Sequence, residues 1–413
     1  MPESQVTYPI MYINTNTRSV DLDPRDTQFV QNPYPAYHAI RAATPVFKWE
    51  QYGHWCCAAY ADVNGLLRDR RFGRQILHVA TREELGWPET PEHLKPFYAF
   101  EQHSLLELEP PVHTRLRGLV SRAFLSRQIE RLRPEIANLC NRLVDQLDGK
   151  HEADLLTAYA IPIPVAVICD LLGAPIEMAQ QFLSWSNDMV AMYQARRDRA
   201  IEDKAVAATL AFSSFMRDLI RERRGKGGDN LLMELIRAES EQGKLSEDEL
   251  VTTAILMLNA GHEATVHALG NGIKALIEQE AREDIGAGHV EEIMRFDAPL
   301  HMFTRYALED LEWNGLKLKK GETIGLLLGA ANRDPSRFPE PDRFLPSREN
   351  AAQNVSFGAG IHFCIGAPLA RLEMEVALPI LFRRLPHLRL AGPPAYRDAY
   401  HFHGLERLQA TLR

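Results

Sequence analysis

The residues best suited to chemistry lie in one glycine-rich segment near the C-terminus. In FGAGIHFCIG, residues 357–366, three glycines surround a single cysteine, Cys364. Glycine permits turns and a close approach of the backbone to a ligand. The sequence from Ala367 onward has a helical composition with Pro368 at an early position, so Cys364 lies just before a predicted helix N-terminus. Amide donors and the positive helix end there would stabilise a thiolate, which is a good ligand for a soft or borderline metal.

Two other interpretations of Cys364 compete with a metal thiolate. A buried, inert cysteine is the common case, and we assign it to the other four: Cys56, Cys57, Cys140 and Cys169. A zinc site needs further ligands at short spacing, and no second cysteine lies within a few residues of Cys364. A single thiolate among glycines suits a flat ligand that already brings four donors to its own metal, and haem is such a ligand.

This segment resembles the haem-binding signature of the cytochrome P-450 family, the haem-thiolate monooxygenases. The family pattern is Phe-Gly-x-Gly-x-His-x-Cys-x-Gly followed by Leu-Ala-Arg, and residues 357–371 match every fixed position. The resemblance covers nearly the whole chain. It implies haem b (iron protoporphyrin IX) as cofactor, Cys364 as the ligand of its iron, and a binding loop framed by Phe357, Gly358 and Gly366.

Cationic side chains elsewhere in the chain fit the same resemblance. His113 and Arg117 lie four apart on one face of a predicted helix, which by itself is typical of a solvated basic surface. The resemblance implies that both contact the haem propionates, where charge-assisted hydrogen bonds to carboxylates are strong. Arg305 and His362 are similar to the family's other propionate partners.

Glu292 and Arg295 have the spacing of an i,i+3 ion pair on a helix, a pattern that many chains contain by chance. The resemblance implies that they form a structural network with an arginine of the following proline-rich stretch. We assign that arginine to Arg343, with Arg348 as the alternative. The network would serve folding and haem retention rather than chemistry.

A long predicted helix, about residues 250–280, carries AGHEAT at its centre, residues 260–265. A glycine costs about 1 kcal/mol relative to alanine in a helix, so either a crowded helix crossing or a flat ligand is indicated. The family runs this helix over the distal haem face with the pattern Ala-Gly-x-Glu/Asp-Thr-Thr, in which the acid, here Glu263, relays protons. Ala264 stands in place of the first threonine, and Thr265 lies about 100° further around the helix. We hypothesise that a substrate hydroxyl or an ordered water replaces the missing hydroxyl in this catalytic segment.

The substrate contacts can be predicted by position only. They are Ala260, Ala264, Leu300, His301 and Phe402. We expect a mainly apolar pocket with few polar groups, suited to a small organic substrate.

The elements that position these residues indicate an α+β protein, mainly α with small β regions. We predict one domain over residues 1–413. Its helical body spans about 110–300 and 365–385, and its β-rich part spans about 46–59, 312–328 and 387–413. The resemblance implies the triangular helical prism of the cytochrome P-450 fold.

Composition limits the remaining possibilities. The 413 residues carry 47 basic and 55 acidic side chains, a net charge of −8, which does not suggest a nucleic-acid binder. No stretch of about 20 apolar residues indicates a membrane span, and no signal peptide is visible. Five cysteines without a disulfide pattern fit a reducing compartment, so we predict a cytoplasmic protein.

The predicted activity follows from the resemblance. It is a haem-thiolate monooxygenase that activates O₂ with electrons from a ferredoxin, supplied through a ferredoxin reductase by NAD(P)H. A locally basic stretch, residues 110–129, would attract such an acidic partner. Two alternatives stay open: a peroxygenase that uses hydrogen peroxide, because Ala264 alters proton delivery, and a non-catalytic haem or ligand-binding protein.

Overall fold

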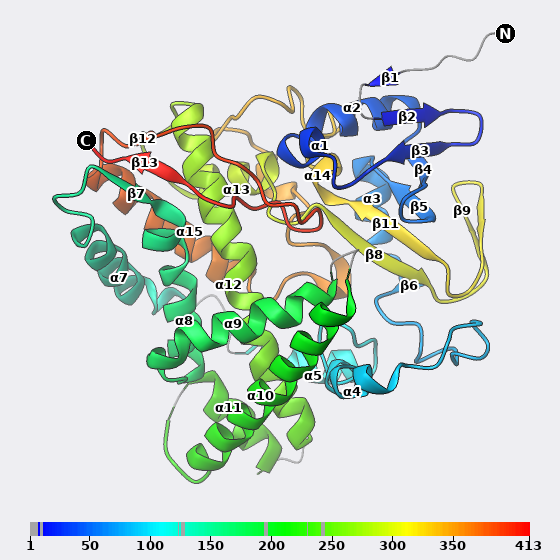
Figure 1. Cartoon of the computed structure of the whole chain (residues 1–413), viewed down its shortest axis with the longest axis horizontal. Coiled ribbons are helices and arrows are strands. Elements are labelled where there is room, and N and C mark those ends of the chain that lie inside the picture. Colours follow the sequence, from blue (N-terminus) through cyan, green and yellow to red (C-terminus); the bar gives the residue numbers. More distant parts are fainter. Residues whose placement is uncertain are drawn as a thin grey trace.

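A helical body and a strand-rich part lie side by side in this computed structural model, in which one long helix, α12, runs through the middle (Figure 1). The structure describes residues 7–8, 11–122, 124, 129–193, 197–228, 230–240 and 244–413. The predicted class, mainly α with small β regions, is confirmed. Among the described residues, no helix combines the length and apolarity that crossing a bilayer requires.

The helices gather mostly in the middle of the chain. Their bounds are α1 (Thr27–Gln31), α2 (Tyr34–Ala43), α3 (Tyr60–Leu66), α4 (Lys95–Glu101), α5 (Val112–Val120), α7 (Arg133–Asp145), α8 (Pro162–Leu172), α9 (Ala179–Val190), α10 (Arg199–Arg223), α11 (Leu231–Ser240), α12 (Glu247–Glu278), α13 (Ala287–Phe296), α14 (Leu328–Ala331) and α15 (Ala367–Arg384).

The strands gather near the two ends of the chain. Their bounds are β1 (Thr7–Tyr8), β2 (Met11–Asn14), β3 (Ser19–Leu22), β4 (Val46–Trp49), β5 (His54–Cys57), β6 (Phe72–Gly73), β7 (Glu152–Asp154), β8 (Met302–Ala307), β9 (Leu311–Trp313), β10 (Leu316–Leu318), β11 (Thr323–Leu327), β12 (Arg389–Leu390) and β13 (Gln409–Thr411).

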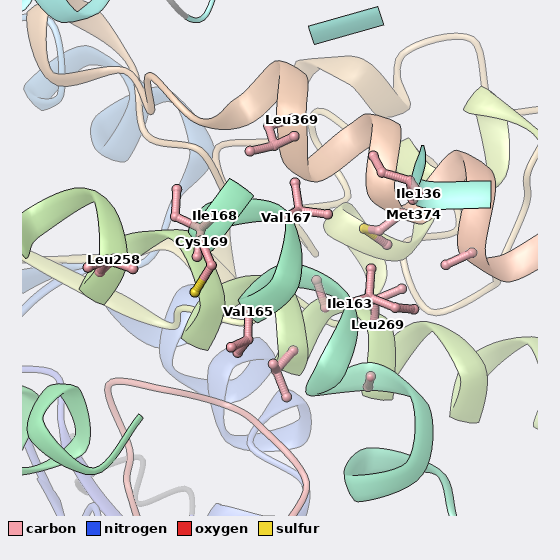
Figure 2. Packing of buried hydrophobic residues seen from close by; sticks show 14 of the residues in the cluster. Ile136, Ile163, Val165, Val167, Ile168, Cys169, Leu258, Leu269, Leu369 and Met374 are labelled. Atoms are coloured by element: carbon pink, nitrogen blue, oxygen red, sulfur yellow. The ribbon is translucent and has the colours of Figure 1, made fainter. Parts of the chain in front are cut away.

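Helix α12 is the axis of the helical body. A capping box starts it, in which the Ser246 hydroxyl accepts from the Glu249 amide and the Glu249 carboxylate accepts from the Ser246 amide. Most of its 32 residues are buried on every side, as expected of a helix in the centre of a core. Figure 2 shows apolar side chains of α8, among them Ile163 and Val167, packed with residues of α12 and α15.

The largest sheet joins distant parts of the chain in the order β1-β2-β3-β4-β5-β11-β8-β6. Strand β11 pairs in parallel with β5 and antiparallel with β8, and this pairing sets Arg305 opposite Ile324. The sheet therefore fixes the strand that carries one of the predicted haem contacts.

The predicted β regions are only partly correct. The hairpin at 46–59 and the strand after 323 are present, whereas 312–318 forms two short strands, β9 and β10, paired as a hairpin. Strands β2, β3 and β8 were not predicted, and 387–413 contains only β12 and β13, which join β7. These strands are short, and their pairing depends on partners far along the chain.

The ion pair of α13 is completely buried. The Arg295 guanidinium donates to the Glu292 carboxylate at 2.7 and 2.8 Å, and both side chains are 0% exposed. Arg295 also donates to three carbonyls, those of Asn332, Pro341 and Arg343. Removing only one residue of such a pair would leave the other charge buried and uncompensated, which strongly destabilises a fold.

The third member of this network differs from the one predicted. Arg348, not Arg343, directs its side chain at Glu292, with 3.3 Å between Nε and the carboxylate. Arg343 contributes its carbonyl, and its exposed side chain pairs with Glu340.

Replacing Glu292 with Gln should lower the free energy of unfolding by about 3–5 kcal/mol, because it leaves the Arg295 charge buried and uncompensated. Urea unfolding followed by circular dichroism measures the change. The control is Asp203→Asn, which breaks an exposed i,i+4 pair with Arg199 and should cost at most about 0.5 kcal/mol. Equal costs for the two variants would contradict this account.

Candidate functional site

The loop that carries Cys364 is a tight turn directly before α15. The amide of Cys364 donates to the carbonyl of Phe357 at 2.9 Å, which closes the loop. Gly358 and Gly360 have φ angles of 67° and 70°, in the left-handed region that favours glycine. A Cβ at Gly360 would also overlap the carbonyl of Leu67, so the loop requires glycine at this position.

Cys364 differs from the other four cysteines, which are buried, because its side chain has accessible surface. Burial in the protein nevertheless raises the pKa of its thiol, although the amides of Gly366 and Ala367 and the charge of Arg117 lower it. Such a thiol stays protonated at neutral pH until a cation binds its thiolate.

The middle of α12 is also accessible, although most of the helix is buried. Ala260 is exposed, and Glu263 and Ala264 are partly exposed, whereas Thr265 is buried. Thr265 therefore does not present its hydroxyl on the face that Ala264 leaves without one. Burial raises the pKa of Glu263 to about 7, against the lowering effect of Arg397.

Gly261 has a different role from its neighbours on α12. A Cβ there would lie 3.0 Å from Cγ1 of Ile168 on α8. The glycine thus serves a crowded helix crossing, one of the two explanations that the sequence left open, and the accessible positions beside it remain available to a ligand.

The predicted propionate partners on α5 lie against the Cys364 loop. The rings of His113 and His362 are 4.4 Å apart between centroids. Arg117 Nη2 donates to the carbonyl of Phe363 at 2.5 Å. Helix α5 therefore holds two of the four predicted contacts next to the cysteine.

Two members of this group have unused capacity for a ligand. His113 Nε2 is buried without a hydrogen-bond partner among the described residues. Arg305 is 3% exposed and donates to the backbone carbonyl of Thr304 at 2.9 Å. Burial lowers the pKa of Arg305 to about 9. An unpartnered imidazole nitrogen and a buried guanidinium without an ion-pair partner in the described part of the chain are suited to a ligand that carries carboxylates.

Sequence reasoning missed one charged member of this group, Glu109. Its carboxylate lies 3.1 Å from His362 Nε2 and accepts from the Arg74 amide at 2.5 Å. The histidine and the backbone donor hold the pKa of this carboxyl below its usual range despite burial. Its place four residues before His113 was the available signal, but spacing alone did not separate it from the other acids.

The predicted substrate contacts do not all face the same environment. Leu300 and Phe402 are partly exposed and meet through an isolated β-bridge, which brings the C-terminal segment next to the start of β8. His301 is 0% exposed, and its Nδ1 lies 2.9 Å from the Tyr37 hydroxyl. A fully buried ring offers no surface to a substrate, so the structure contradicts the assignment of His301.

Comparison with known proteins gives this arrangement a context. The family model described as Cytochrome P450 matches residues 288–390. The chain is 37% identical over 413 residues to the Vitamin D(3) 25-hydroxylase of Pseudonocardia autotrophica, covering 96% of this chain and 98% of that protein. It is 34% identical over 406 residues to the polyketide biosynthesis cytochrome P450 PksS of Bacillus subtilis (strain 168), covering 94% and 98%.

The chain belongs to the cytochrome P450 family. The fold agrees, because the crystal structure of P450BioI in complex with an acyl carrier protein ligated to hexadec-9Z-enoic acid superimposes with a TM-score of 0.86 at 31% identity. That match covers 94% of this chain and all of the other. The protein is accordingly a P450 monooxygenase, an oxidoreductase that incorporates oxygen into its substrate, and its cofactor is haem b.

The residues of this P450 fit haem b. An accessible sulfur lies before a helix N-terminus, the unpartnered His113 Nε2 lies against its loop, and small accessible residues occupy the middle of α12. A flat group with a metal and two carboxylates would use all three features.

Replacing Gly360 with Ala should disturb the cysteine loop, because the new Cβ meets the Leu67 carbonyl at a left-handed φ. The φ angle alone costs about 1–2 kcal/mol. We expect a lower haem-to-protein ratio and a lower thermal unfolding midpoint, measured by absorption and calorimetry. The control is Gly392→Ala, where nothing lies within 4 Å of the added atom; identical behaviour of the two variants would count against the turn as the constraint.

Proposed function

We propose that this P450 uses Cys364 as the ligand of the haem iron and inserts one oxygen atom of O₂ into a small organic substrate by hydroxylation, dealkylation or epoxidation. The observation that carries the proposal is the accessible Cys364 sulfur that faces the amides of Gly366 and Ala367. When bound, haem supplies the binding and activation of O₂, with the thiolate as electron donor to the iron. The remaining steps depend on side chains of the chain itself.

His113, Arg117, Arg305 and His362 would bind the propionates. The unpartnered His113 Nε2 and the buried Arg305 support this role most directly. Binding a carboxylate would satisfy donors whose burial otherwise costs free energy. Haem and fold would therefore stabilise each other.

We infer that the electrons come from a ferredoxin, reduced by a ferredoxin reductase with NAD(P)H. The basic stretch 110–129 supports docking of an acidic protein less strongly than its composition suggests. Arg115 pairs with Glu249 at 2.5 Å, and Arg117 points at the Phe363 carbonyl. Arg122 is exposed, and Arg127 lies outside the described residues. The cytoplasmic location stays a prediction from the sequence.

The substrate class follows from the accessible residues at the site. Ala260, Ala264, Leu300 and Phe402 are apolar and have accessible surface. They favour an apolar organic molecule, held mainly by burial of its surface. Names of relatives such as Vitamin D(3) 25-hydroxylase agree with a substrate of this kind.

Proton delivery is the step in which this chain departs from the family pattern. Glu263 has a pKa of about 7, so its carboxyl can give and regain a proton near neutral pH. Since Ala264 has no hydroxyl, we propose that a substrate hydroxyl or an ordered water carries the proton onward. The same gap favours a second candidate, a peroxygenase, because hydrogen peroxide brings its own protons.

The reduced protein with carbon monoxide should show a strongly red-shifted Soret band, because the thiolate donates electron density to the iron. Cys364→Ser should abolish this band completely, while Cys140→Ala, a change at a buried cysteine, should keep it. Absorption spectroscopy measures both. A red-shifted band that persists in Cys364→Ser would refute Cys364 as the ligand.

Restoring the hydroxyl by Ala264→Thr should raise the product formed per NAD(P)H by about 10-fold for a substrate without its own hydroxyl, less than a fully positioned proton donor contributes. Turnover driven by peroxide should not change. Ala264→Val is the control, since it matches threonine in size and lacks the hydroxyl. Unchanged coupling in Ala264→Thr would reject the altered route, and turnover with peroxide alone would favour the peroxygenase.

A further inference from the structure

His267 lies one helical turn after Glu263 on α12 and faces it. The distance from His267 Nε2 to the nearer oxygen of Glu263 is 4.0 Å, so a small rotation of the glutamate side chain brings the two to hydrogen-bond distance. His267 is 3% exposed. The family pattern quoted for this helix ends before position 267, so the function described above leaves this residue without a role.

The second ring nitrogen of His267, Nδ1, takes no part in the contact with Glu263. Nδ1 is buried without a hydrogen-bond partner among the described residues. Leaving a buried polar atom unsatisfied costs about 1–3 kcal/mol. A side chain needed only for packing could be apolar at this position without that cost, so the unsatisfied nitrogen points to a functional requirement.

The C-terminal segment packs against His267. Any side chain at Gly404 would overlap the imidazole, so the turn there is shaped around the ring. The Phe402 ring lies 6.2 Å away between centroids. The imidazole is thus held between α12 and this segment.

Three other groups act electrostatically on members of the pair. Arg397 is exposed and lowers the pKa of both Glu263 and His267. His403 on the C-terminal segment and His262 on α12 are the other titratable groups that act on His267.

We propose that His267 is a positioning residue for Glu263, which orients its carboxyl by donating a hydrogen bond from Nε2. This inference rests on the proposed role of Glu263 in proton delivery. Nε2 keeps its proton, so no covalent bond forms or breaks at the imidazole.

The protonation states suit this hydrogen bond. Burial, reinforced by the charge of Arg397, lowers the pKa of His267 to about 3, whereas burial raises that of Glu263 to about 7. Near neutral pH the imidazole is therefore neutral and keeps one N–H to donate.

The first test follows the carboxyl stretching band of Glu263 by infrared spectroscopy in the haem-loaded ferric enzyme, with Glu263→Gln to assign the band. The acid band should fade as pH rises through about 7 in the wild type. In His267→Leu the midpoint should rise by about one pH unit, because the carboxylate loses a donor worth about 1.4 kcal/mol. His267→Gln, which keeps a donor near Nε2, should restore the midpoint.

The control is His262→Gln, since His262 Nδ1 already lies 2.8 Å from the Leu258 carbonyl. Its midpoint should equal that of the wild type. A midpoint in His267→Leu within 0.2 units of the wild type, taken as the ~0.3 kcal/mol limit of the measurement, would overturn the positioning role. If the leucine variant does not fold, an altered midpoint in His267→Gln would overturn it equally.

The second test asks whether the orientation of Glu263 affects turnover. His267→Leu should lower product per NAD(P)H by about 10-fold, the magnitude of a weak general acid–base contribution, and His267→Gln, which keeps the donor, should restore it. Unchanged coupling in His267→Leu would overturn the positioning role. Loss of the carbon monoxide band or of all reductant-driven turnover in the wild type would instead refute the proposed function, and the infrared titration, which needs no turnover, keeps the two failures apart.

Discussion

The buried ion pair of Glu292 and Arg295 is the interaction on which the site depends. Two charges without solvent are tolerated only when every donor is satisfied, and Arg295 achieves this by binding carbonyls of the loop after α14. Asn332 in that loop donates to the Ser356 hydroxyl at 2.7 Å and accepts from the Val355 amide at 2.8 Å. Ser356 directly precedes the cysteine loop. The hydrogen bonds that satisfy the buried Arg295 therefore also help to position the segment that leads to Cys364.

The sequence alone was sufficient to predict those parts of the site whose conformation is set by residues close together in the chain. The glycines around Cys364 predicted a turn before a helix, and φ angles near 70° at Gly358 and Gly360 explain why glycine is needed. The recurrence of apolar residues at three- and four-residue spacing predicted the long helix α12, and Ser246 with Glu249 forms the capping box that starts it. In these cases the residues that specify the structure are neighbours in the chain.

The remaining features depend on contacts between distant segments, which spacing does not encode. Strands β2 and β3 are short, and they become strands because β4 pairs with β3. Arg343 and Arg348 have the same residue type in the same loop, and the fold alone selects Arg348 to face Glu292. His301 is directed into a buried cluster by the Tyr37 hydroxyl, and a single sequence gives no sign of that partner.

Buried polar atoms without hydrogen-bond partners link stability with function in this site. His113 Nε2 and His267 Nδ1 are buried without partners among the described residues, and each lowers the stability of the empty chain. Near Cys364 a carboxylate-bearing cofactor can supply the missing partner. Beside Glu263 the unpartnered nitrogen belongs to the imidazole that we propose to orient the carboxyl. The same physical cost therefore accompanies cofactor binding in one part of the site and the positioning of Glu263 in another.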